Sequence, residues 1–135
     1  MLQLLSKIAA ERTDLEQQAI YHEIKLREDQ MSTAMGRGIA IPHARVEGLE
    51  QSYIFVAQNR HGLEWDSPDG RMVRLLILIL SPKESPNAQI QILQCLANVL
   101  HNRDSAQALV SSNDPSFIWA SLRNELNASR HCNID

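Results

Sequence analysis

Met72-Val-Arg-Leu-Leu-Ile-Leu-Ile-Leu80 is a nearly continuous apolar run in a chain of 135 residues. Such a run, interrupted by a single charged side chain, is typical of a strand that is buried on both faces of a sheet. Ser81-Pro82 follows it directly and marks its end. The run therefore predicts a buried strand at the centre of the fold.

Helical patterns lie on both sides of this run. Upstream, apolar residues at helical spacing predict helices over residues 2–11 and from about 14 to 26. Downstream, three further helices are predicted to begin near residues 86, 104 and 115, where Pro, Asp or Ser residues precede an apolar stripe. Helices that precede and follow a strand-rich middle predict an α/β sandwich of layers.

Short strands, loops and turns are predicted between the helices. Residues 30–38 have the composition of a loop, and residues 39–41 form a short β-like run that Pro42 stops. Residues 52–58 predict a strand with β-branched and aromatic side chains, and His61-Gly62 predicts a turn.

The composition is that of one domain, with residues 1–127 as the folded part and 128–135 as a disordered tail. The chain has 13 basic and 16 acidic residues without a basic cluster, which argues against a nucleic-acid surface. Its longest apolar run is too short to span a bilayer. Two cysteines without C-x-x-C spacing favour the cytoplasm over a disulfide framework, and no spacing of histidines or cysteines predicts a metal site or a cofactor.

Several features converge on His43. Gly36 and Gly38 permit the close approach of another backbone or an oxyanion. Pro42 stiffens the chain directly before the histidine. Arg27 lies at the end of a predicted helix that leads into the same loop, and its guanidinium offers a planar fork of donors suited to a phosphate or a carboxylate.

A neutral imidazole is a nucleophile, and its reference pKa of about 6.5 leaves much of it neutral near pH 7. Attack on a phosphoryl group requires positioning and donor groups around the phosphoryl oxygens. Arg27, the hydroxyls of Ser32 and Thr33, and the backbone at Gly38 are the predicted phosphate-binding groups.

Each of these residues also has a purely structural interpretation. A single Pro-His pair is common, and His43 taken alone is more often a structural or surface histidine. Arg27 can end a solvated helix with weak ion pairs, and Ser32 and Thr33 can be turn residues. The spacing of these residues leaves both interpretations open.

The wider pattern resembles a known family. Arg27-Glu28, Ser32-Thr33 and Gly36-x-Gly-Ile-Ala-Ile-Pro-His43-Ala-Arg45 are similar to the signature of the fructose/mannitol-type enzyme IIA domain of the bacterial phosphotransferase system. Nitrogen-regulatory enzyme IIA proteins share this signature. The segments Leu63-x-Trp65-x-x-x-Asp69-Gly70 and Gln89-Ile-Gln-Ile-Leu93 follow the same order as in the family, so the resemblance covers about residues 1–125.

The resemblance implies a mixed central β-sheet flanked by helices on both sides. It implies that His43 accepts a phosphoryl group from the phosphocarrier HPr or a relative, and that Arg27 stabilises the phosphate. In transport members of the family, a cysteine of an enzyme IIB partner then takes the phosphoryl group and passes it to a sugar.

The chain departs from the family pattern at two places. Family members have a second active-site histidine at the start of the helix after the Ser-Pro turn, where this chain has Gln89. The Gln89 amide can donate to a phosphate oxygen but cannot carry a positive charge, and a plain polar residue is an equally good interpretation. The strand and loop that usually precede the first helix are also missing before Met1, so we expect the N-terminal leader to be absent.

Two functions remain open at this point. In the first, the chain is a phosphoryl carrier that accepts the group from HPr on His43 and passes it to an enzyme IIB cysteine. In the second, it is a regulatory module that binds a transporter or a kinase in a phosphorylation-dependent way. The presence of His43 and Arg27 favours the first function, whereas Gln89 and the short N-terminus favour the second.

Overall fold

The apolar run forms β5 (Val73–Pro82), the central strand of a five-stranded sheet, as predicted. On one side β5 pairs antiparallel with β4 (Tyr53–Leu63). On its other side it pairs in parallel with β2 (Ile39–Ala40) and then with β3 (His43–Val46). The strand β1 (Ala34–Gly36) pairs antiparallel with β2 and completes a mixed sheet.

The strands β2 and β3 form one line along β5 that is broken at Pro42. Ile39 pairs with Leu75 and His43 pairs with Ile79, so the register is the same before and after the break. Pro42 has no N–H to donate, but its carbonyl accepts a hydrogen bond from the Ile79 N–H at 3.0 Å. The alignment with β5 therefore fixes the position of His43 directly after the break.

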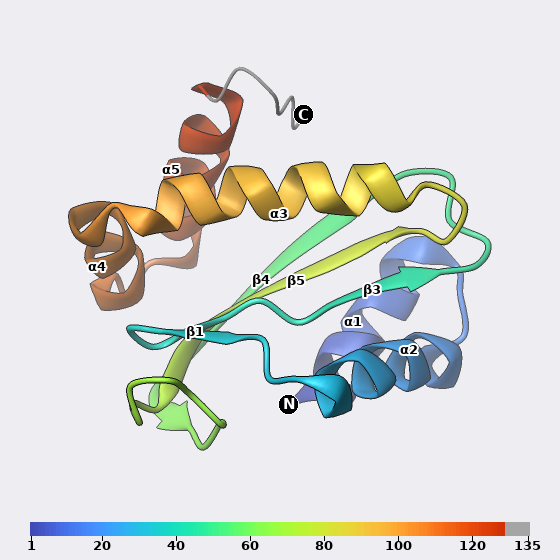
Figure 1. Cartoon of the computed structure of the whole chain (residues 1–135), viewed down its shortest axis with the longest axis horizontal. Helices are drawn as coiled ribbons and strands as arrows, with labels where there is room; N and C mark the ends of the chain where they lie inside the picture. The colour runs from blue at the N-terminus through green and yellow to red at the C-terminus, as the bar shows by residue number, and fades with distance from the viewer. Residues whose placement is uncertain (129–135) are drawn as a thin grey trace.

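The computed structural model describes residues 1–128. Helices cover both faces of its sheet (Figure 1). The helices α1 (Leu2–Thr13) and α2 (Gln17–Gln30) lie on one face. The helices α3 (Pro86–His101), α4 (Arg103–Ser111) and α5 (Pro115–Ala128) lie on the other. This arrangement confirms the predicted α/β fold with a mixed sheet between two helical layers. No helix within residues 1–128 combines the length and the apolar character that crossing a bilayer requires.

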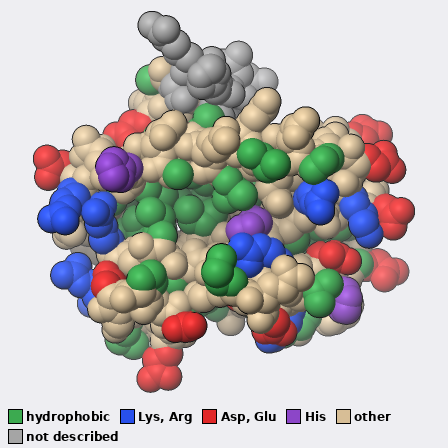
Figure 2. All heavy atoms as spheres, viewed as in Figure 1, with side chains coloured by type: hydrophobic (Ala, Val, Ile, Leu, Met, Phe, Trp, Pro, Cys, Tyr) green, Lys and Arg blue, Asp and Glu red, His purple; other side chains and the backbone are tan. Residues whose placement is uncertain are grey.

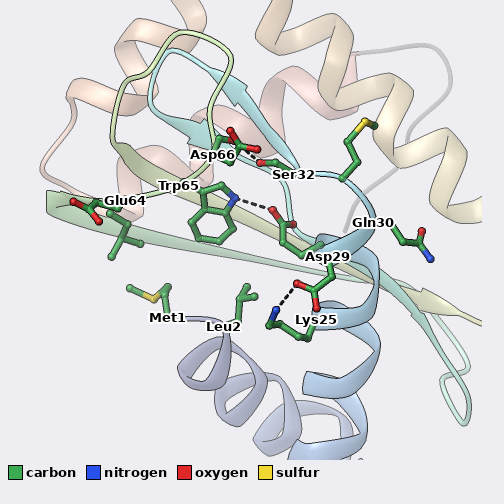
Figure 3. A pocket seen from close by; sticks show the side chains of 12 residues that line it. Met1, Leu2, Lys25, Asp29, Gln30, Ser32, Glu64, Trp65 and Asp66 are labelled. Carbon is green, nitrogen blue, oxygen red and sulfur yellow. Dashed lines mark hydrogen bonds and ion pairs between the residues drawn. The ribbon is translucent and has the colours of Figure 1, made fainter.

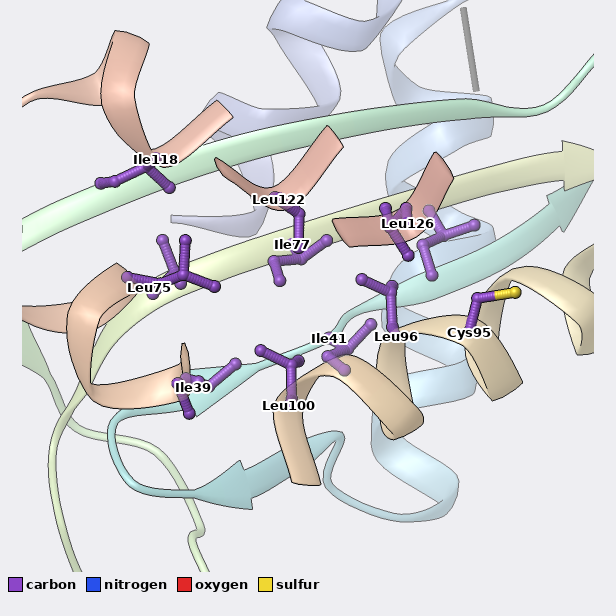
Figure 4. Packing of buried hydrophobic residues seen from close by; sticks show 13 residues of the cluster. Ile39, Ile41, Leu75, Ile77, Cys95, Leu96, Leu100, Ile118, Leu122 and Leu126 are labelled. Atoms are coloured by element: carbon purple, nitrogen blue, oxygen red, sulfur yellow. The ribbon is translucent and has the colours of Figure 1, made fainter. Parts of the chain in front are cut away.

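The alternation of side chains along β5 divides the core into two clusters. Leu75, Ile77 and Ile79 pack against the layer of α3, α4 and α5. Figure 4 shows Leu75 and Ile77 among the side chains of this cluster. Leu76, Leu78 and Leu80 face α1 and α2 on the opposite side. Because all six side chains are fully buried, the near-continuous apolar run is explained by a strand with two covered faces.

Two local predictions in the middle of the chain are wrong. Residues 34–36 form β1 rather than loop, because Gly36, Arg37 and Gly38 all adopt positive φ and turn the chain tightly into β2. No turn occurs at His61-Gly62, since β4 continues to Leu63 with a shift of register. The irregular stretch, with Gly62 at φ +81°, is a bulge-like feature inside the strand.

The C-terminal part of the chain differs from expectation in two details. The helix α5 ends at Ala128, so this residue is helical, and the rest of the predicted tail, residues 129–135, lies outside the described residues. Cys95 belongs to α3 and packs in the core as expected, but its sulfur is disulfide-bonded, which the cysteine count did not predict. Cys132 lies outside the described residues.

Candidate functional site

His43 is the first residue of β3, and its ring is held by the chain just before it. Its Nδ1 lies 2.8 Å from the carbonyl oxygen of Ile41. Because a carbonyl oxygen only accepts hydrogen bonds, this contact assigns the proton of the neutral ring to Nδ1. The lone pair is then on Nε2, which is the nitrogen available as a nucleophile.

The surroundings of His43 favour the neutral form of the ring. Burial is the largest cause that lowers the pKa of His43 below its ordinary value of 6.5, and the nearby charge of Arg27 lowers this pKa further. The hydrogen bond to Ile41 and the charge of Glu28 act in the opposite direction but do not outweigh burial. A histidine with a lowered pKa is deprotonated at Nε2 at neutral pH, as nucleophilic attack requires.

A cleft of about 360 Å³ opens at His43, between α2, the edge strand β3 and the first turn of α3. Figure 2 shows a hollow on this face of the molecule, with a histidine and basic side chains near its edge. Three basic residues and one acidic residue line the cleft, which gives it an excess of positive charge: Arg27, Arg45, Lys83 and Glu23. Such a balance favours an anionic group at the imidazole.

Arg27 comes from the last turn of α2 and is half-buried. Its Nη1 donates a hydrogen bond of 2.9 Å to the carbonyl of Met31, just after the end of the helix. The guanidinium makes no other hydrogen bond or ion pair within residues 1–128. The structure therefore brings Arg27 into the same cleft as His43, oriented by one contact and with further N–H groups available.

Gln89 lies in the first turn of α3 and lines the cleft from the side opposite α2. Its Nε2 atom is buried and has no hydrogen-bond partner. An unpaired buried amide donor is costly in a folded protein, so an acceptor is expected to satisfy it in some state of the molecule. A phosphoryl oxygen on His43 is an acceptor of the right kind.

The remaining predicted phosphate ligands lie elsewhere. The Ser32 hydroxyl donates to the Asp66 carbonyl, and the Thr33 hydroxyl donates to Glu28 at 2.6 Å. Gly38 lies in the turn between β1 and β2, where a Cβ atom would meet Val110. The structure does not bring these three residues to the cleft, and a phosphate-binding role for them stays a prediction.

Two basic residues of the cleft, Arg45 and Lys83, were not identified as site residues from the sequence. Alternate residues of a strand project to the same face, so the spacing of His43 and Arg45 contained a usable signal. Lys83 follows the end of β5, and only the pairing of β3 with β5 brings it close. Residues 1–128 contain no group of three or more metal-ligating side chains.

Comparison with known proteins identifies the family of the chain. The family model described as phosphoenolpyruvate-dependent sugar phosphotransferase system, EIIA 2, matches residues 1–125. A nitrogen regulatory protein of Bradyrhizobium diazoefficiens is 32% identical over 121 residues, which span 90% of this chain and 79% of that protein. A fructose-specific EIIA component of Haloferax volcanii is 30% identical over 86 residues, which span 64% of this chain and 56% of that protein.

A solved structure extends the comparison to the fold. The nitrogen regulatory protein IIA-Ntr from Neisseria meningitidis superposes with a TM-score of 0.82, covering 90% of this chain and 83% of that chain. The sequence identity is 24%, so this likeness concerns the fold alone. Because the family model covers almost the whole chain, the protein belongs to the EIIA 2 family of the phosphoenolpyruvate-dependent sugar phosphotransferase system, a family of phosphoryl-transfer domains.

Proposed function

We propose that this chain is a regulatory phosphoacceptor domain, in which a phosphocarrier of the HPr type phosphorylates His43 and a partner protein responds to the phosphorylated state. The observation that carries the proposal is the state of the His43 ring. Its Nδ1–H donates a hydrogen bond to the Ile41 carbonyl, so the lone pair is on Nε2. The ring lines a cleft that has an excess of positive charge.

The proposed transfer needs no proton movement. The Nε2 lone pair of His43 attacks the phosphorus atom and forms an N–P bond, while the bond to the donor breaks and its electron pair stays with the donor atom. The ring keeps its proton on Nδ1 and gains positive charge, which strengthens the hydrogen bond to the Ile41 carbonyl. In this proposal Arg27 and the Gln89 amide, which line the same cleft as His43, bind the phosphoryl oxygens.

The regulatory assignment is supported by the relatives. A protein that shares 32% identity over most of this chain is named a nitrogen regulatory protein. A phosphoryl group adds a charge of up to about −2, which can change the affinity for a partner without further chemistry. We therefore favour phosphorylation as a signal on this domain.

The direct test is phosphorylation in a reconstituted system. The protein is incubated with phosphoenolpyruvate, enzyme I and HPr, and its intact mass is followed. We expect an acid-labile gain of one phosphoryl group, which is absent in His43→Ala and present in the control His101→Ala on the exposed end of α3. Absence of the gain with several HPr homologues would contradict the proposal.

A second function, relay of the phosphoryl group to an enzyme IIB cysteine in sugar uptake, is favoured by the fructose-specific relative. The two functions differ in what happens after phosphorylation. Phosphorylated protein is mixed with enzyme IIB proteins of the fructose and mannitol types, and the label on each protein is measured over time. Rapid transfer to an enzyme IIB cysteine supports the carrier function, and retention of the label together with phosphorylation-dependent partner binding supports the regulatory one.

A further inference from the structure

Glu28 lies next to Arg27 on α2 but does not line the His43 cleft. We propose that Glu28 is a positioning residue for His43, acting through Thr33 and Ile41 to orient the imidazole and to keep its proton on Nδ1. The inference rests on the proposed role of His43 as phosphoacceptor, but its structural part can be measured without any phosphoryl transfer.

The Glu28 carboxylate accepts three hydrogen bonds. Its Oε1 accepts from the backbone N–H of Thr33 at 2.9 Å and from the indole N–H of Trp65 at 2.7 Å. Its Oε2 accepts from the Thr33 hydroxyl at 2.6 Å. Figure 3 shows the bond from the Trp65 nitrogen, next to a second pocket that lies beside the start of α1. Hydrogen bonds to a carboxylate are stronger than neutral ones, so Thr33 is held firmly against the end of α2.

Thr33 transmits this position to the nucleophile. Its carbonyl accepts a hydrogen bond from the Ile41 N–H at 3.1 Å. The Ile41 carbonyl in turn accepts the Nδ1–H of His43 at 2.8 Å. Each residue of the series therefore holds the next, from the Glu28 carboxylate to the imidazole ring.

The series of hydrogen bonds links the two proposed site residues, Arg27 and His43. Glu28 follows Arg27 directly on α2, so the carboxylate that anchors Thr33 also ties the end of this helix to the strand line that carries His43. The bond that a histidine makes through one ring nitrogen determines which nitrogen holds the proton. A displaced Ile41 carbonyl would release the ring and allow the proton to move to Nε2, where it blocks attack.

A purely structural role for Glu28 predicts a different result, namely lower stability with an unchanged ring. The measurement that separates the two roles is the protonation pattern of His43 in the unphosphorylated protein, read from its imidazole ¹⁵N chemical shifts above the pKa. The initial rate of phosphorylation by phospho-HPr is the second readout. Circular dichroism confirms that each variant is folded.

Matched variants isolate the series. Glu28→Ala removes the anchor, and Thr33→Val removes the hydroxyl bond while Thr33→Ser restores it. Trp65→Phe removes a bond to Glu28 that lies outside the series. Asp29→Asn removes the neighbouring carboxylate, which pairs with Lys25 on the surface of α2.

We expect Glu28→Ala to shift the proton of His43 toward Nε2 and to lower the phosphorylation rate by about tenfold or more, since misplacement by an ångström can cost about a hundredfold. Thr33→Val gives the same changes to a smaller degree, and Thr33→Ser, Trp65→Phe and Asp29→Asn give neither. A folded Glu28→Ala protein with the wild-type ring pattern and rate would overturn the inference.

Should Glu28→Ala not fold, the Thr33→Val and Thr33→Ser pair decides in its place, and equal ring patterns in the two would overturn the inference. The failure of the proposed function looks different. In that case the wild-type protein is not phosphorylated at all, whereas the ring pattern still responds to Glu28.

Discussion

Nδ1 of His43 lies 2.8 Å from the carbonyl oxygen of Ile41, two residues earlier in the chain. Pro42 connects the two residues and restricts the backbone between them. The contact places the acceptor for the ring proton within the same rigid segment as the ring. The hydrogen bond within this segment therefore determines which ring nitrogen of His43 carries the proton. Burial and the nearby charges determine whether the ring is neutral.

The charge of His43 gives a prediction for pH dependence. Because its pKa is lowered below 6.5, chiefly by burial, we expect His43 to stay neutral at pH 7 and to titrate on the acid side of 6.5. Arg27→Gln removes a charge that lowers this pKa, so the titration should move upward. An NMR titration of the His43 ring tests both points, with Arg123→Gln on α5 as the control. A midpoint above 6.5 in the wild-type protein would contradict the prediction.

The same shift has a consequence for stability. The unfolded chain binds a proton at His43 more readily than the folded protein does. The contribution of neutral His43 to the free energy of unfolding is therefore fully present above the pKa of the unfolded chain, about 6.5. This contribution decreases as the pH falls from 6.5 through the lower pKa of the folded protein. The loss should be smaller in His43→Gln, which cannot take up the proton.

The guanidinium of Arg27 gives a second prediction. Arg27→Gln should lower the rate of phosphorylation by about a hundredfold, the scale on which a donor to a developing anion acts. Arg27→Lys retains the charge but loses the planar fork, so its rate should lie between those of Arg27→Gln and the wild type. Initial rates with phospho-HPr provide the measurement. Equal rates for Arg27→Lys and the wild type would show that charge alone matters.

Gln89 gives a third prediction, in which two properties change in opposite directions. Its buried Nε2 has no partner, so Gln89→Leu should raise the free energy of unfolding of the unphosphorylated protein by about 1 kcal/mol. The same variant should hold the phosphoryl group for a shorter time, because the donor to the phosphate is lost. Thermal unfolding and the decay of the label test the two parts.

A matched control and a converse variant complete the Gln89 test. Gln94→Leu removes an exposed amide from the same helix, and it should change neither property. Gln89→His introduces a side chain that can carry a positive charge, and it should lengthen the lifetime of the label. An unchanged lifetime in both Gln89 variants would place the residue outside the phosphate site.

Asp69 gives a fourth prediction, for acid stability away from the cleft. Its carboxylate accepts hydrogen bonds from the backbone N–H groups of Arg37 at 2.7 Å and Arg71 at 3.1 Å, and these bonds lower the pKa of Asp69 to about 2. Because the folded pKa lies below the unfolded value, this stability is present above pH 3.8 and is lost as the pH falls toward 2.

The measurement for Asp69 is thermal unfolding between pH 2 and pH 5. Asp69→Asn should unfold at a lower temperature than the wild type at pH 5, and the difference should shrink as the pH approaches 2. Asp66→Asn removes an exposed carboxylate from the same connection and should follow the wild-type curve. A constant difference across the range would contradict the role of the carboxylate charge.

Much of the fold could be predicted because local patterns and tertiary structure agree. The apolar run ended where Pro82 ends β5, and Pro86 begins α3 as expected. The prediction failed at residues 34–36 and at Gly62, where glycines that usually mark loops serve a tight turn and a bulge inside paired strands. Whether such a glycine lies in a loop or inside a strand depends on how the strands pair, and a short stretch of sequence does not show this pairing.

The site was predicted in part for a similar reason. His43, Arg27 and Gln89 line one cleft, although they come from three separate elements. Ser32 and Thr33 are close to Arg27 in sequence but their hydroxyls bond to Asp66 and Glu28 instead. Proximity to the motif in sequence grouped these residues together, but the direction of each side chain depends on hydrogen bonds between distant elements.

The edge position of β3 has one more consequence, which concerns unwanted assembly. Among the described strands β3 pairs only with β5, so its other edge has no strand partner. Unpaired strand edges recruit strands from other chains and lead to aggregation. β3 is only four residues long and carries the charged, exposed side chain of Arg45, and a short, charged edge is a poor template for such pairing. The strand that carries His43 can therefore present this edge to a transient partner without inviting a permanent one.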